Sequence, residues 1–346
     1  MSQDDLKERA PIDGEPDSSN NTANSTTAGS PGGRKRSLLT YGLIGVLLAA
    51  IGIALLVFVI GPRLQTDEDP LATGPDITVV KKDSATDSTE PDLRGSFTDL
   101  LFQPREQVAE HPLDPALEVA RLGLERIRNE VHDYTALMVK QERVKGKLLP
   151  EEFLRVKVRH SSAEPPINKA FYVRHVKPKK MAGQEAIWVE NENDGKLIAH
   201  GTGLEKLIPV PPLNPTGVIP MRNNRYPITE LGIETLIIRM LEKGERDRQH
   251  DDGCTVEVSR DLQLDGNPCT LITITHPKQQ DPFEFHIAKI YIDDKLQLPV
   301  GYEGYMWPEE PGGEPVLIER YFYREIQINV GLTDLDFDRD NPEYDY

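Results

Sequence analysis

The chain has 346 residues, and its 40 Lys and Arg against 57 Asp and Glu give it a formal net charge of −17. This acidity argues against binding to nucleic acid, whose phosphates repel a negatively charged surface. Common catalytic signatures are missing: no Gly-rich phosphate loop follows a strand, and neither His-Glu-x-x-His nor Gly-x-Ser-x-Gly occurs. We therefore expect a protein that is not an enzyme, with no catalytic residues, no metal ligands and no cofactor.

The first 61 residues predict a tail followed by a membrane span. Residues 1–37, which precede the span, are poor in apolar side chains, and this composition indicates a disordered tail. Residues 38–61 contain no charge, and at about 1.5 Å per helical residue they are long enough to cross a hydrocarbon core of about 30 Å. The apolar run is longer than that of a cleaved signal peptide, so we predict a retained signal anchor.

The charges that flank residues 38–61 predict the direction of crossing. Arg34, Lys35 and Arg36 precede the span, whereas Asp67, Glu68 and Asp69 follow it. Because positive charges remain on the cytoplasmic side, we expect a single-pass protein of the cytoplasmic membrane with a cytoplasmic N-terminus. Residues 62–111 then form a flexible linker, and residues 112–346 form one extracytoplasmic domain.

The predicted domain begins with a helix. Asp114 is a suitable N-cap and Pro115 suits the first turn. Apolar residues follow at spacings of three and four and form one stripe: Leu117, Ala120, Leu124, Ile127 and Val131. After a Pro-rich break, Thr229 is expected to cap a second helix.

Alternating apolar and polar residues predict strands on both sides of the second helix. The expected strands are residues 134–144, 153–160, 170–176, 184–190, 196–200, 254–258, 269–276, 283–292, 299–307 and 316–330. Short connections imply antiparallel neighbours. The predicted fold class is α+β: a curved antiparallel sheet, or half-open barrel, with two packed helices, preceded by the transmembrane helix.

Two cysteines, Cys254 and Cys269, lie on the side of the membrane that we expect to be oxidising. Each falls in a strand-like segment with a turn between them, so they would face each other across a hairpin. A disulfide and two buried thiols are equally consistent with this pattern.

Two polar clusters in the sequence are potential sites. Residues 174–180 carry Arg174, His175, Lys177, Lys179 and Lys180, which would meet anionic lipid heads or an acidic partner, although a positive loop in an acidic protein explains them more simply. The other cluster, residues 250–252, is interpreted as a solvated turn rather than a cation site.

Apolar side chains on the predicted strands are the candidate ligand-binding residues. If the sheet curls more strongly than its helices fill, the remaining concavity becomes an apolar pocket. The residues expected around it are Leu154, Val156, Val158, Phe171, Trp188, Phe283, Phe285 and Tyr291.

Four blocks in order along residues 112–346 resemble a bacterial family of domain-of-unknown-function proteins. The blocks are DYTALMVKQERVKGKLLPEEF, GQEAIWVENENDGKLIAH, MRNNRYPITELG and INVGLTDLDFDRDNP. A more distant resemblance, to the LolA and LolB lipoprotein-carrier superfamily, lies in the first helix, the Tyr-Thr-Ala strand and the strand around residues 292–300. That resemblance implies an incomplete barrel that binds acyl chains, and a related periplasmic sensor has the same architecture.

The sequence therefore supports a leading hypothesis and an alternative. The leading hypothesis is a membrane-anchored extracytoplasmic domain that binds a lipid, a lipoprotein or another hydrophobic ligand without catalysis. The alternative is an envelope sensor or scaffold that contacts a protein partner and signals through the transmembrane helix. A retained anchor argues against a freely shuttling carrier.

Overall fold

The computed structural model describes residues 75, 77–79, 97–101, 111–162, 165–203, 209–250 and 253–346. Its strands are β1 Ile77–Val79, β2 Asp133–Val144, β3 Lys147–Leu148, β4 Glu152–Arg159, β5 Ala170–Lys177, β6 Glu185–Val189, β7 Ile198–His200, β8 Thr255–Leu264, β9 Asn267–Thr275, β10 Ile287–Asp293, β11 Leu298–Met306 and β12 Val316–Ile328. Its helices are α2 Asp114–Glu130 and α3 Ile233–Asp247, with short 3-10 turns at Phe97–Leu101, Asn193–Gly195, Pro220–Arg222, Ile228–Glu230 and Asp334–Phe337.

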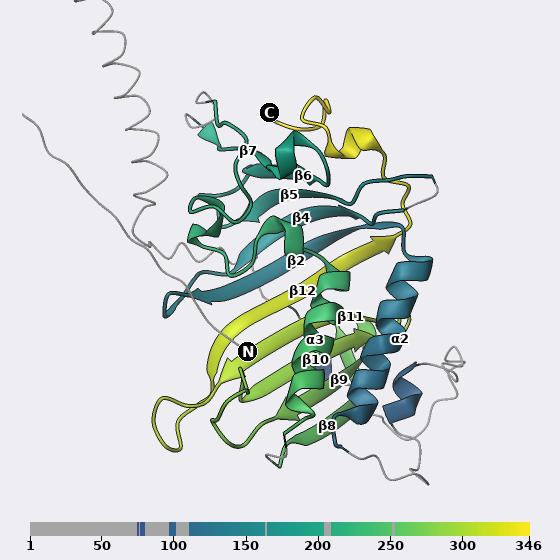
Figure 1. Cartoon of the computed structure of the whole chain (residues 1–346), viewed down its shortest axis with the longest axis vertical. Helices are drawn as coiled ribbons and strands as arrows, with labels where there is room; N and C mark the ends of the chain where they lie inside the picture. Colours follow the sequence, from purple (N-terminus) through teal and green to yellow (C-terminus); the bar gives the residue numbers. More distant parts are fainter. Residues whose placement is uncertain are drawn as a thin grey trace, which may run out of the picture. The chain divides into compact units, whose positions relative to one another are not determined.

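All the strands belong to one 12-stranded antiparallel sheet (Figure 1). The strand order is β1-β8-β9-β10-β11-β12-β2-β4-β5-β6-β7, and β3 pairs with β2. Two runs of sequential neighbours, β2 to β7 and β8 to β12, therefore meet where β12 pairs with β2. Among the residues that the structure describes, the sheet ends at β1 and β7, so it is not closed into a barrel.

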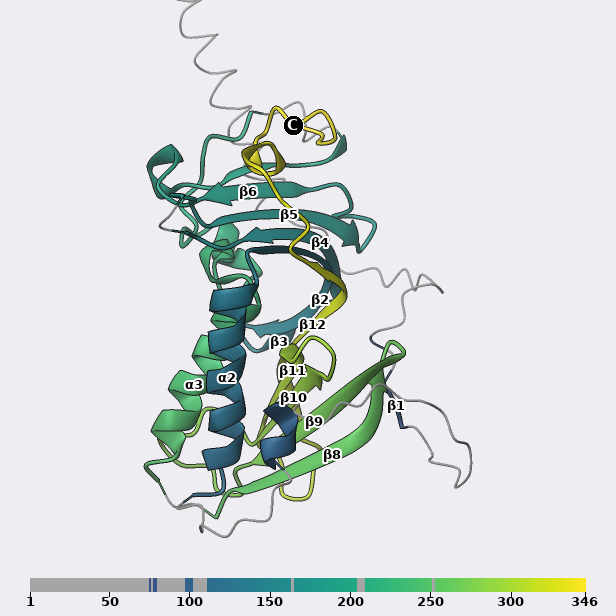
Figure 2. The ribbon, with the colours of Figure 1, turned by 90° about the vertical axis from the view of Figure 1, so that its right-hand side faces the viewer.

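Both long helices lie on the same face of the sheet, which curves around them (Figure 2). The main core fills the space between the helices and this concave face, and it includes Leu117, Ile127, Ile233 and Ile237 from the helices. A second cluster, with Val139 and Phe322 fully buried, lies on the opposite face, since neighbouring residues of a strand point to opposite sides. The predicted curved antiparallel sheet with two packed helices is confirmed.

Helix α2 follows the predicted apolar stripe, but its first residue differs from the expectation. Leu117, Ile127 and Val131 are buried as predicted. Asp114 is the first helical residue rather than the N-cap, which is Leu113. The Asp114 carboxylate instead accepts a hydrogen bond of 3.0 Å from the backbone N–H of His111.

Helix α3 begins at Ile233, four residues after the predicted cap at Thr229, so that prediction was wrong. Gly232 precedes the helix with φ 111°, a conformation that favours glycine. Two buried tyrosines replace the expected cap, because Tyr134 Oη accepts the N–H of Ile233 at 2.9 Å and Tyr323 Oη accepts that of Gly232 at 3.2 Å. The sheet itself therefore satisfies the first N–H groups of this helix.

We expect Tyr134→Phe to lower the free energy of unfolding by about 1 to 3 kcal/mol, because it leaves the buried N–H of Ile233 without an acceptor. Chemical denaturation of the purified chain measures this loss. Tyr302→Phe is the control, since it removes a hydroxyl from the same buried cluster and leaves both helix contacts in place. Equal losses for the two variants would contradict the capping role.

Several strand and linker boundaries differ from those expected from the sequence. Strand β10 begins at Ile287, so Phe283 and Phe285 lie in the irregular segment before it rather than in the strand. The expected linker contributes β1, which pairs with β8, and a 3-10 turn whose Thr98 is buried. Within the described part of the chain, no helix is long and apolar enough to cross a membrane. The predicted span, residues 38–61, and the predicted tail lie outside the described residues.

Candidate functional site

A cavity of about 350 Å³ lies between the concave face of the sheet and α3 with the segment that precedes it. Most of its walls are apolar. The sheet contributes Met138, Leu154, Val173, Ile274, Ala288, Ile290, Tyr302, Tyr321 and Tyr323, and α3 contributes Leu236 and Met240. Small side chains at inward positions, Ala186, Ala199 and Ala288, leave volume that the helix does not fill.

One end of the cavity holds a row of buried charged residues, which we call the polar belt: Lys140, Glu142, Glu152 and Glu319. Their exposed fractions are 8%, 5%, 7% and 4%. Strand register builds the row, because Glu319 of β12 pairs with Glu142 of β2 and Lys140 of β2 pairs with Glu152 of β4. Lys140 Nζ lies 3.6 Å from both Glu142 and Glu152, so a single ammonium serves two carboxylates.

Burial and neighbouring charges have opposite effects on the pKa values of Glu152 and Lys140 in the polar belt. Burial disfavours the ionised form of Glu152, but Lys140 and the hydrogen bond from His175, at 3.2 Å, hold the pKa of its carboxyl below the ordinary value. Burial likewise opposes the charge of Lys140, and the two glutamates raise its pKa despite that. Lys140 and Glu152 therefore each favour the charged form of the other in this buried position.

The segment before α3 is fastened to the polar belt. The Glu142 carboxylate accepts the N–H of Arg225 at 3.1 Å, and the Glu319 carboxylate accepts Arg225 Nε at 2.7 Å and Tyr226 Oη at 3.1 Å. Burial and the neighbouring Glu319 raise the pKa of Tyr226 to about 12, so it remains a donor. These contacts hold the segment across one end of the cavity.

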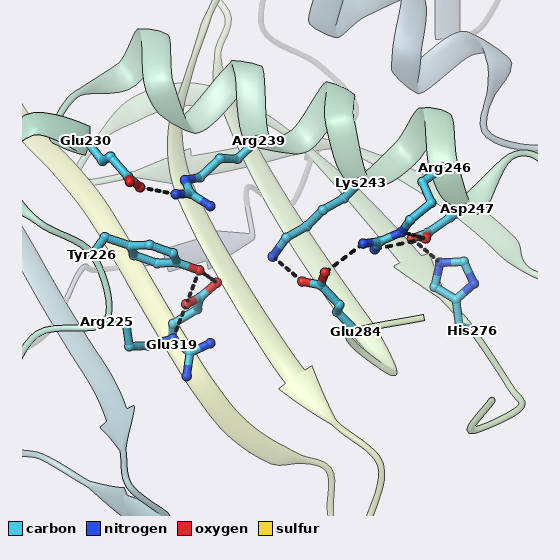
Figure 3. Close-up of polar contacts among 10 residues, drawn as sticks. All are labelled: Arg225, Tyr226, Glu230, Arg239, Lys243, Arg246, Asp247, His276, Glu284 and Glu319. Atoms are coloured by element: carbon cyan, nitrogen blue, oxygen red, sulfur yellow. Dashed lines mark hydrogen bonds and ion pairs between the residues drawn. The ribbon is translucent and has the colours of Figure 1, made fainter. Parts of the chain in front are cut away.

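A second row of polar contacts runs along the cavity side of α3 (Figure 3). Arg239 pairs with Glu230. Glu284 bridges Lys243 at 3.2 Å and Arg246 at 2.7 Å. In addition, Asp247 lies 3.6 Å from His276 Nε2, and burial raises the pKa of the Asp247 carboxyl. The apolar cavity is thus bordered by paired charges on the helix as well as on the sheet.

The structure places five of the eight candidate apolar residues in the main core: Leu154, Val156, Val158, Phe171 and Phe285. Of the eight, Leu154 and Phe285 line the cavity. Trp188 packs against this core, with its ring 5.7 Å from that of Phe171. Phe283 stacks on His276 at 4.4 Å. Tyr291 belongs to the cluster on the opposite face, away from the cavity.

The structure contains no disulfide between Cys254 and Cys269, although both side chains are buried. Register explains why the two cannot meet. Cys269 pairs with Leu262, near the β8–β9 turn, whereas Cys254 precedes Thr255 at the far end of β8. At about 3.3 Å per residue the two cysteines are separated by roughly 25 Å along the strands. The expectation that they face each other was wrong.

No group of three or more potential metal ligands occurs among the residues that the structure describes. Asp251 and Asp252, which the sequence placed in a solvated turn, lie outside them. Of the predicted basic cluster, His175 turns inward to Glu152, while Lys179 and Lys180 are exposed.

The polar belt is the part of the site that the sequence reasoning missed. A signal was present, because Lys140 and Glu142 continue the alternation of Tyr134, Ala136 and Met138, all on the concave side. Which residues of β4 and β12 lie beside Lys140 and Glu142, however, depends on the register between segments that are far apart in the chain.

The fold and the cavity define a class: an unclosed antiparallel sheet that holds an apolar cavity beneath two helices. A family model described as a protein of unknown function (DUF1571) matches residues 131–346. The chain belongs to this family, which confirms the resemblance seen in the sequence. A search of curated proteins found no match.

Three solved structures are similar at low identity. A putative outer membrane lipoprotein-sorting protein domain from Vibrio parahaemolyticus is 12% identical, with 63% of this chain and 97% of that chain covered and a TM-score of 0.27. A LolA superfamily protein from Nitrosomonas europaea is 12% identical, with 67% and 99% covered and a TM-score of 0.21. The MucA/MucB complex of Pseudomonas aeruginosa is 13% identical, with 64% and 60% covered and a TM-score of 0.35. Since each TM-score is below 0.5, these likenesses do not indicate a shared ligand or partner.

Proposed function

We propose that this domain binds a hydrophobic ligand with a long apolar chain, such as a lipid or the acyl part of a lipoprotein, without chemical conversion. The observation that carries the proposal is the cavity of about 350 Å³ beneath α3, because small-molecule sites are typically concave, largely apolar and about 300 to 1,000 Å³ in volume. The aliphatic and tyrosine walls suit methylene groups, whose removal from water supplies about 0.8 kcal/mol each.

The polar belt supports binding rather than catalysis. Convergent ionisable groups in a pocket are a feature of active sites. Here, however, the carboxylates already accept hydrogen bonds from neighbouring side chains. Glu142 accepts a hydrogen bond from Tyr321 Oη at 2.6 Å, and Glu319 accepts hydrogen bonds from Arg225 and Tyr226. These contacts position the segment that closes one end of the cavity.

We also propose that residues 38–61 anchor the chain in the cytoplasmic membrane, with the domain on the extracytoplasmic side. The uncharged span, the preceding basic residues and the following acidic ones support this arrangement. A domain tethered in this way would exchange its ligand near the bilayer.

Photo-cross-linking tests the ligand proposal with the full chain in membranes. Cells that make the protein receive a fatty acid with a diazirine near its terminal methyl, and peptide mass spectrometry locates the adducts. We expect adducts on peptides that line the cavity, such as those with Met138, Met240 and Ile290. Adducts confined to residues 38–61 would show contact with bilayer lipid only and would reject the proposal.

Matched variants sharpen this test. Ala288→Met fills part of the cavity and is expected to reduce the cavity adducts several-fold. Thr273→Met adds a side chain to β9, the neighbouring strand, on the opposite face of the sheet, since Thr273 lies between the inward-facing Ile272 and Ile274. It is expected to leave the adducts unchanged.

A further inference from the structure

Two segments beside the cavity are free of acidic residues in an otherwise acidic chain. Residues 174–184 comprise the end of β5 and the turn to β6, and residues 209–229 lead to α3. Neither segment contains Asp or Glu, although the net charge is −17. Both segments reach the cavity, because Met181 from the first and Ile219 from the second line it. We call residues 177–184 and 214–223 the mouth loops.

The second mouth loop carries an unusually exposed apolar tip. Val218 is 88% exposed and the adjacent Ile219 is 37% exposed. Hydrogen bonds fix this turn, since the N–H of Gly217 donates to the Asn214 carbonyl at 2.8 Å and that of Met221 donates to the Gly217 carbonyl at 3.0 Å. An ordered backbone therefore carries the exposed Val218, and the partly exposed Ile219 links this tip to the cavity lining.

Both mouth loops carry positive charge. Lys179 and Lys180 of the first mouth loop are exposed, and Lys177 and Arg222 are half-buried. Val176, just before the first loop, is 40% exposed. Cationic and apolar side chains together match the interface of an anionic bilayer, where head groups attract lysine and acyl chains accept apolar groups.

We propose that the mouth loops dock on an anionic phospholipid surface, with Val218 and Ile219 inserted among the lipids and the lysines against the head groups. The choice of a lipid surface over an acidic protein rests on the proposed function, because the loops flank the cavity that would take a chain from the bilayer. Docking would bring the cavity opening to its source of ligand.

An environment-sensitive label on the full chain tests this docking. Val218→Cys is labelled with NBD, while the native cysteines are buried, and the chain is studied in vesicles of phosphatidylcholine with or without phosphatidylglycerol. We expect a blue shift of NBD emission and quenching by doxyl-labelled lipid only with phosphatidylglycerol. High salt should reverse both changes, and each Lys→Gln change at Lys179 or Lys180 should weaken docking about fivefold.

Val330→Cys is the matched control, because Val330 is 42% exposed and follows the end of β12, which pairs with the start of β2, away from the mouth loops. Equal quenching at both positions, or the same emission in both vesicle types, would overturn the proposal. A shift caused by soluble poly-glutamate and not by vesicles would assign the loops to an acidic protein instead. If the NBD label shows no docking but the cross-linking adducts in the cavity still form, the docking surface is rejected and the ligand proposal stands.

Discussion

Replacing Lys140 with methionine is expected to lower the free energy of unfolding by about 3 to 5 kcal/mol. The ammonium group is 3.6 Å from both Glu142 and Glu152, and all three side chains are buried. Methionine fills similar volume but leaves two carboxylates without their shared cation. Chemical denaturation of the purified chain at pH 7 measures the loss.

Acidification should distinguish this electrostatic loss from a packing defect. In the wild type, the lowered pKa of Glu152 contributes stability above the carboxyl's unfolded pKa of about 4.3, and that stability is lost as pH falls through the folded value. Without Lys140, burial would favour the protonated carboxyl, so the stability gap between wild type and variant should narrow from pH 7 toward pH 4. Lys147→Met, at an exposed position, is the control. A gap independent of pH would contradict the assigned role.

Longer acyl chains are expected to bind more tightly, by about fourfold or 0.8 kcal/mol per methylene, until the cavity is full. The reason is that each methylene transfers from water to the aliphatic and aromatic walls around Met138, Leu154 and Phe285. Competition of saturated fatty acids of increasing length against the diazirine probe measures this dependence on the full chain.

The position of the optimum reports on the cavity itself. Ala288→Met adds three heavy atoms to the wall, so we expect the best competitor to be shorter by about three methylenes. Thr273→Met should keep the wild-type optimum. Affinity that does not depend on chain length, or an identical optimum for both variants, would argue against occupancy of this cavity.

The elements with strong local signals were predictable. The stripe of α2 and the alternation of β2, β4 and β12 follow from spacing alone, and together they indicated an antiparallel sheet with two helices. The start of α3 was not predictable in this way. Its first N–H groups bond to Tyr134 and Tyr323, on strands far away in sequence, and local rules favoured Thr229 instead.

The candidate site was only partly predictable for the same reason. Alternation indicates which residues share a face, and of the residues that it singled out on β4, Leu154 lines the cavity. It does not indicate which face is concave along each strand, and Tyr291, which we expected around the pocket, lies in the cluster on the opposite face. The polar belt needs the register of Glu319 against Glu142, which no local pattern contains.

The seam between β12 and β2 has a consequence for biosynthesis. It joins the first and last long strands of the domain, Asp133–Val144 and Val316–Ile328. Synthesis proceeds from the N-terminus, so β2 emerges while its final partner is still to be made, and one of its edges remains open during that interval. The two halves of the sheet join only after β12 has been synthesised, so closure of the main core is a late, non-local step. Chaperones that shield strand edges would assist this chain most during that interval.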